Sequence, residues 1–118
     1  MEKFVISKKN GEFRFVFVDR NGLVLLKSGS YTRKTMCING IESIKRNSQD
    51  NSKFKCKRSL NNESYFNLKS FNGKIIGMSI MFKDKISRDL AIEFVKNNAI
   101  GASIDDQSKR FLKAEIYL

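Results

Sequence analysis

The feature that most constrains the fold of this chain is a duplication. The segment NGLVLLKS at residues 21–28 returns as NGKIIGMS at residues 72–79, an offset of 51 positions. The same offset relates GIESIK at residues 40–45 to AIEFVK at residues 91–96. The chain therefore holds two copies of one unit, and a unit of about 50 residues lies near the lower limit for an independent core. We expect each copy to depend on the other.

In each copy, the residue pattern predicts three strands followed by a helix. Phe13, Phe15 and Phe17 alternate with other side chains in the second predicted strand, and Phe66 and Leu68 match two of them in the second copy. This alternation places one face of a strand in the core. Asn-Gly pairs separate the strands at three of the four turns, because these residues accept the positive φ angles of tight turns. The first turn of the second copy, Leu60-Asn61-Asn62, is one residue longer.

Two amphipathic helices are predicted at residues 34–47 and 85–98, where apolar residues recur at helical spacing. Gly40 in the first helix matches Ala91 in the second, so both positions require a small residue. We expect both to lie against strand backbone. The equivalent buried pairs are predicted to be Ile41 with Ile92 and Ile44 with Val95.

The end of the chain has no counterpart in the first copy. A short strand is predicted at residues 102–106, and apolar alternation predicts another at residues 111–118. The second helix carries Leu90 and Phe94 where the first has polar residues, and exposing both would leave an apolar patch. We expect the final segment to cover them.

By length the chain is one domain, residues 1–118. It comprises a first repeat at about 1–53, a second repeat at about 54–107 and a C-terminal extension at 108–118. No apolar run is long enough for a secretory signal or a membrane span. We therefore expect a cytoplasmic monomer that does not contact a membrane.

At the repeated stretches the chain resembles the YegP-like family, small bacterial and archaeal domains without an established function. The resemblance is carried by NGLVL at 21–25, NGIESIK at 39–45, YFNLK at 65–69 and NGKIIG at 72–77. It implies an α+β fold in which two tandem units of three strands, a helix and a strand form one barrel-like antiparallel sheet. Two packed helices and a pseudo-two-fold axis complete this expected fold. The second helix reads LAIE where the family has Asn-Gly-Ile-Glu, and the family supplies no active site to carry over.

The residues that catalysis and metal binding require are scarce. The chain has no His and no Gly-rich phosphate loop. Cys37 and Cys56 do not form a CxxC pair, and we predict that both are buried structural thiols. The sequence therefore predicts a protein that is not an enzyme, with no catalytic residues, no cofactor and no metal.

Net charge leaves two hypotheses for function. The chain carries 23 Lys and Arg against 12 Asp and Glu, a net charge of +11, spread over both repeats. Such a charge favours anionic partners but also serves solubility. The first hypothesis is a protein-interaction or accessory module that uses an exposed sheet edge or the helix pair. The alternative is a protein that binds nucleic acid or another polyanion through a basic helical face made of Lys34, Lys45, Arg46, Lys85 and Lys96.

Overall fold

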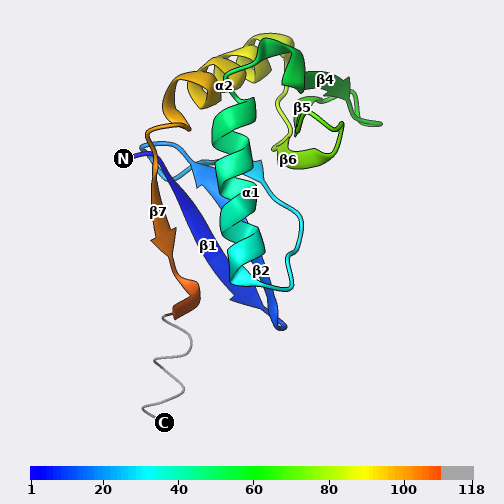
Figure 1. Cartoon of the computed structure of the whole chain (residues 1–118). Helices are drawn as coiled ribbons and strands as arrows, with labels where there is room; N and C mark the ends of the chain where they lie inside the picture. The colour runs from blue at the N-terminus through cyan, green and yellow to red at the C-terminus, as the bar shows by residue number, and fades with distance from the viewer. Residues whose placement is uncertain (110–118) are drawn as a thin grey trace.

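The computed structural model describes residues 1–109, in which one seven-stranded sheet is combined with two helices (Figure 1). The elements in chain order are β1 (Lys3–Lys9), β2 (Glu12–Val18), β3 (Val24–Lys27), α1 (Lys34–Asn47), a 3-10 turn (Asn51–Lys53), β4 (Phe54–Arg58), β5 (Ser64–Lys69), β6 (Ile75–Ser79), α2 (Lys85–Asn98) and β7 (Ser103–Asp106). The predicted α+β class is confirmed. Both helices have the predicted bounds.

The sheet is open, and its strand order is β4-β5-β6-β3-β2-β1-β7. Neighbouring strands are antiparallel except β7, which pairs parallel with β1. The expected sheet was wholly antiparallel and barrel-like, so the observed one differs in being mixed and unclosed. A parallel pair is possible here because β1 and β7 are far apart in the chain and are not joined by a tight hairpin, which would make them antiparallel.

A pseudo-two-fold axis relates the two copies. Its position is given by the β3–β6 pair, where Lys27 lies opposite Met78, the residue 51 positions later in the chain. Bulges occur at equivalent points of β2 and β5. The helices are related by the same offset at both ends. Of the strands in residues 1–109, β7 is the one that the axis leaves without a partner.

One hydrophobic core serves both copies. Its largest fully buried side chains come from four strands and both helices: Phe4, Ile6, Phe15, Phe17, Leu26, Ile41, Ile44, Phe66, Leu68 and Val95. The predicted inward positions of β2 and β5 are thereby confirmed. Three of the four predicted helix positions are also fully buried, whereas Ile92 is only partly buried. A core shared in this way agrees with the expectation that each repeat depends on the other, which stays a prediction.

The reason for the small residue at Gly40 differs from the prediction. A Cβ atom added there would meet the ring of Tyr31 at 2.9 Å and Cε2 of Phe15 at 3.1 Å. Its nearest neighbours are therefore side chains and not strand backbone. The close approach occurs because the Tyr31 ring stacks on Phe15 beneath the helix, with ring centroids 6.4 Å apart.

The predicted short strand near the end of the chain is confirmed as β7. Phe94 is partly buried and packs on Phe17, with ring centroids 6.1 Å apart, whereas Leu90 is 66% exposed. The predicted strand at residues 111–118, and its covering role, lie outside the described residues. No helix within residues 1–109 is long and apolar enough to cross a membrane.

Candidate functional site

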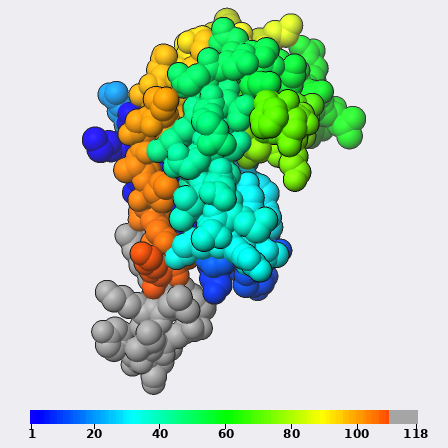
Figure 2. Space-filling model, viewed as in Figure 1, coloured from blue at the N-terminus to red at the C-terminus, as the bar shows by residue number. Residues whose placement is uncertain are grey.

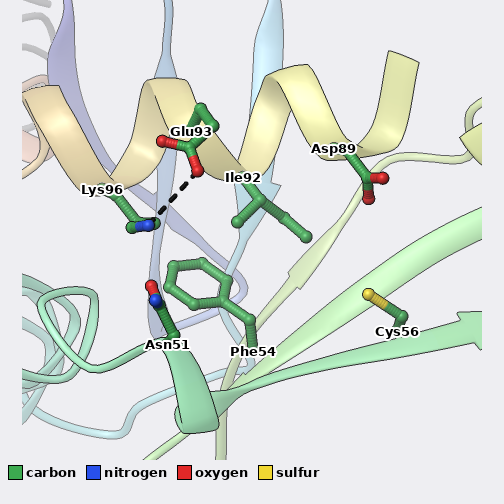
Figure 3. A pocket seen from close by; sticks show the side chains of 7 residues that line it. All are labelled: Asn51, Phe54, Cys56, Asp89, Ile92, Glu93 and Lys96. Atoms are coloured by element: carbon green, nitrogen blue, oxygen red, sulfur yellow. Dashed lines mark hydrogen bonds and ion pairs between the residues drawn. The ribbon is translucent and has the colours of Figure 1, made fainter. Parts of the chain in front are cut away.

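A groove with a volume of about 350 Å³ lies between β4 and α2. Figure 3 shows Phe54 from β4 and Ile92 from α2 facing each other at its centre. Asn51 and Lys96 lie toward one end, and Cys56 and Asp89 toward the other. The remaining lining residue is Glu93. The groove therefore has an apolar middle and polar ends.

The groove exists because β4 is an end strand of the described sheet. Phe54 and Cys56 occupy its inward positions, as the alternation predicts, but Cys56 is exposed. The prediction of two buried thiols is therefore wrong for Cys56 and correct for Cys37. Burial, followed by the nearby Asp106 carboxylate, raises the pKa of Cys37 to about 11. Cys37 is thus a protonated thiol near neutral pH, while Cys56 faces the groove.

In the first copy, the equivalent position is filled by β7. Phe4 on β1 lies opposite Phe17, just as Phe54 on β4 lies opposite Leu68, so β1 and β4 are equivalent strands. β7 pairs along the outer side of β1, with Ile104 opposite Phe4. Phe4 is completely buried as a result, whereas Phe54 is only partly buried. Ile41 and its counterpart in α2 show the same difference.

Three lysines hold β7 in place. Lys34 on α1 pairs with Asp106 at 2.8 Å, and Lys3 on β1 pairs with Asp105 at 3.0 Å. Lys45 Nζ donates a hydrogen bond to the carbonyl oxygen of Ala102 at 3.0 Å. In Figure 2 the end of the described chain, coloured orange, lies directly alongside α1. β7 is therefore bound by both its backbone and its two carboxylates.

The charge of Asp106 reflects these contacts. Partial burial opposes ionisation, but hydrogen bonds from Lys34 and Ser108 outweigh it and hold the pKa of Asp106 below its ordinary value. The carboxylate is therefore ionised at neutral pH and forms a charge-assisted hydrogen bond with Lys34. The side chains of this pair are 28% and 20% exposed, so solvent screens the interaction only in part.

The second copy has equivalent lysines, and one of them, Lys96, lines the groove. Lys53, Lys85 and Lys96 correspond to the three lysines that bind β7. Lys96 pairs with Glu93 at 3.2 Å. Lys53 and Lys85 form no ion pair within residues 1–109. The second copy thus keeps the cationic positions of a strand-binding site, while its strand position holds none of the seven described strands.

The structure does not gather the five predicted polyanion residues into one unoccupied patch. Lys34 and Lys45 bind β7, and their ammonium groups lie 5.9 Å from the ring centroids of Phe13 and Phe4 respectively. Lys96 lines the groove instead, and Lys85 is the exposed first residue of α2. The fifth, Arg46, is exposed on α1.

Residue patterns pointed to the helical cations but missed the groove. The exposed basic residues of β4 are Lys55, Lys57 and Arg58. The amino-acid sequence did contain one signal for the groove. The strand predicted at residues 102–106 occurs only once, so it can pair with the first strand of one copy and not of the other. Among residues 1–109, no group of three or more potential metal ligands gathers in one place.

Comparisons with known proteins identify the family of this chain. The family described as "Domain of unknown function (DUF1508)" matches residues 8–53 and 59–106, once in each repeat. The chain is 39% identical over 100 residues to the "UPF0339 protein in ptx operon 5'region" of Stutzerimonas stutzeri, covering 85% of this chain and 90% of the relative. It is 38% identical over 106 residues to the UPF0339 protein YegP of Escherichia coli K12, covering 89% and 96% respectively.

Solved structures show the same fold. The solution NMR structure of YegP from E. coli, a protein of unknown function, matches with a TM-score of 0.85 and 37% identity, over 91% of this chain and 93% of that one. The solution NMR structure of a UPF0339 protein from Shewanella oneidensis matches with a TM-score of 0.86 and 36% identity, over 92% of each chain. Two repeat matches, identity along most of the chain and a shared tertiary structure agree: this chain belongs to the DUF1508 family of tandem-repeat α+β proteins, together with YegP.

Proposed function

We propose that this protein is an interaction module that binds an extended segment of a partner protein along β4, in the groove beside α2. The observation that carries the proposal is the difference between the two copies. β1 has an added parallel strand, whereas the equivalent β4 is an end strand of the sheet in residues 1–109, with a groove beside it. The predicted cytoplasmic location and monomeric state belong to the same proposal.

An edge strand is suited to this role because it offers unpaired backbone N–H and C=O groups. β4 presents five residues, Phe54–Arg58. Backbone pairing would supply affinity, and the partly buried Phe54 and Ile92 would receive an apolar side chain of the partner. The volume of the groove lies near the lower end of the roughly 300–1,000 Å³ typical of ligand sites. A short segment therefore fits the site better than a folded domain.

Cys56 provides a direct test, because it lies in the groove and is exposed. The rate at which Cys56 reacts with a thiol reagent would be measured with and without strand-forming peptides. Cys37 is buried, so it contributes a slow phase, and Cys56→Ser identifies the fast phase by removing it. We expect bound peptide to slow the fast phase and to protect β4 amides from hydrogen exchange. If neither quantity changes at saturating peptide, strand binding at β4 is refuted.

Nucleic-acid binding is the second candidate, supported by the exposed cations of β4 and by Arg46 and Lys85 on the helices. Phosphate contacts require such cations, and they make affinity depend steeply on salt. Electrophoretic shift with RNA and single-stranded DNA across a salt series tests this role. The informative variant combines Arg46→Glu with Lys85→Glu, since reversing Lys45 would also release β7. Unchanged affinity in this double variant would exclude the helical face.

A further inference from the structure

We infer that the segment bound by the groove is acidic and follows the pattern of β7, an apolar residue followed by two consecutive carboxylates. This inference rests on the proposed strand-binding function. It uses β7 as an internal template, because the two-fold axis relates the β7-binding surface to the groove. The ligand of one surface therefore indicates what the other recognises.

The template assigns a position to each recognition element. In β7 the apolar residue Ile104 lies opposite the inward-facing Phe4. Asp106, two positions later, is on the same face of the strand and meets Lys34 of α1. Asp105 is on the other face and meets Lys3.

The same elements recur in the second copy. Phe54 replaces Phe4, Lys85 replaces Lys34 and Lys53 replaces Lys3. Lys96 replaces Lys45, which binds the carbonyl oxygen two positions before the apolar residue of β7. If a partner strand carries a carboxylate two positions after its apolar side chain, that carboxylate would therefore lie near Lys85.

The charges around the groove agree with an acidic ligand. The cations of β4, of the residue before it and of the two ends of α2 are Lys53, Lys55, Lys57, Arg58, Lys85 and Lys96. Two acidic residues also line the groove, but Asp89 pairs with Arg88 at 3.0 Å and Glu93 pairs with Lys96 at 3.2 Å. Edge lysines oppose pairing with another basic strand, and they become attractive when the added strand is acidic.

The occupant is best assigned to a separate protein. A second copy could offer its own β7, but that strand is already held within its chain by three lysine contacts. An intramolecular site competes at high effective concentration. The final segment of this chain, RFLKAEIYL at residues 110–118, has two cations and one carboxylate and lacks the two consecutive acids. The β7 strand of a second copy has the recognition pattern but is held within its own chain, and the final segment lacks the pattern.

The probe is the chain's own β7 sequence, the peptide AIGASIDDQS of residues 99–108, titrated into the full-length, isotope-labelled protein. Amide chemical shifts locate the binding site, and their concentration dependence gives the dissociation constant. We expect shifts in β4 and α2 and not in β1. The matched peptide AIGASINNQS, in which both Asp residues are replaced by Asn, should bind at least about fivefold more weakly at low salt.

A pair of protein variants tests the assigned cation. Lys85→Glu removes the proposed partner of the second carboxylate, and negative charge suits the first turn of a helix. Arg46→Glu is the matched control, an equal reversal at an exposed cation near the end of the other helix. Lys85→Glu should lower the affinity for the acidic peptide by about fivefold or more. Arg46→Glu should leave this affinity unchanged.

The outcomes separate the inference from the proposed function. If both peptides bind β4 equally, strand binding stands and acidic recognition is wrong. Strand binding itself is wrong if neither peptide changes the amide chemical shifts of β4 at peptide concentrations up to about 1 mM, and if a neutral apolar strand-forming peptide also leaves these shifts unchanged. Shifts in β1 would mean that the probe displaces β7. Concentration-dependent shifts in β4 without peptide would make a second copy the occupant. Either of these last two results overturns the inference.

Discussion

Gly40 in α1 packs against the ring of Tyr31, and the second copy has a different pair of residues at the two equivalent positions. Gly40 lies near the phenolic end of Tyr31, and an added Cβ would come within 2.9 Å of Cζ and still closer to Oη. The equivalent residues in the second copy are Ala91 and Phe82. One copy therefore has a hydroxyl without a methyl, and the other has a methyl without a hydroxyl. We predict that Gly40→Ala is harmful alone and tolerated together with Tyr31→Phe.

Two opposing contributions set the change in the free energy of unfolding that Gly40→Ala causes. Ala is favoured over Gly in a helix interior by about 1 kcal/mol. Overpacking a close-packed site costs about 1–3 kcal/mol. Gly40→Ala should therefore lower the free energy of unfolding by about 0–2 kcal/mol. Tyr31→Phe removes the nearest atom, while the ring carbon at 2.9 Å and Phe15 Cε2 at 3.1 Å remain. The double variant should therefore recover most of the loss through a small shift of the ring and unfold within about 1 kcal/mol of the wild type.

Tyr31→Phe alone is the matched control. The Tyr31 hydroxyl forms no hydrogen bond within residues 1–109, so its removal should change the free energy of unfolding little. The assay is urea unfolding of the four proteins, and the coupling energy follows from the double-mutant cycle. We expect a coupling of about 1–3 kcal/mol. A coupling near zero, or a Gly40→Ala single variant more stable than the wild type, would refute the steric explanation.

Three further predictions concern packing, hydrogen bonding and charge. Gly77→Ala would place a Cβ 3.0 Å from Leu26, so urea unfolding should show a loss of about 1–3 kcal/mol that Leu26→Val reduces. Ser79→Ala removes the acceptor of a buried β5 amide at 2.9 Å, and thermal unfolding should reveal a loss of about 1–3 kcal/mol, with Ser79→Thr as the hydroxyl-retaining control. The folded pKa of Asp106 lies below its unfolded value, so its stabilisation is present above the unfolded pKa and is lost as pH falls through the folded pKa. Urea midpoints between about pH 5 and pH 2 should therefore fall more steeply for the wild type than for Asp106→Asn, and equal slopes would contradict a stabilising Lys34–Asp106 pair.

Local patterns predicted most of the elements. Helical spacing of apolar residues placed both helices at their observed bounds. Strand alternation placed Phe15 and Phe17 in the core, where both are buried. These features are readable because secondary structure and inward faces depend on neighbours within a few positions of the chain. Duplication added the two-fold relation, since equivalent segments adopt equivalent structures.

The candidate site could not be predicted from local residue patterns. Cys56 has the alternation of a buried residue, yet it is exposed because no described strand covers the outer side of β4. Lys34 has the pattern of a solvated helix face, yet it binds a carboxylate 72 positions away. Strand pairing and ion pairing at such separations depend on where the tertiary structure brings the chain back.

The amino-acid sequence by itself determined the repeat, the elements of each copy and the inward face of each central strand, because periodicity and turn residues act locally. Only the tertiary structure decided that β7 pairs with β1 and leaves β4 at the edge of the described sheet. The two edges are equivalent by symmetry, and one strand after α2 can occupy only one of them. Hydrogen bonds and lysine contacts formed across the whole chain select that edge, and the groove is the consequence at the other.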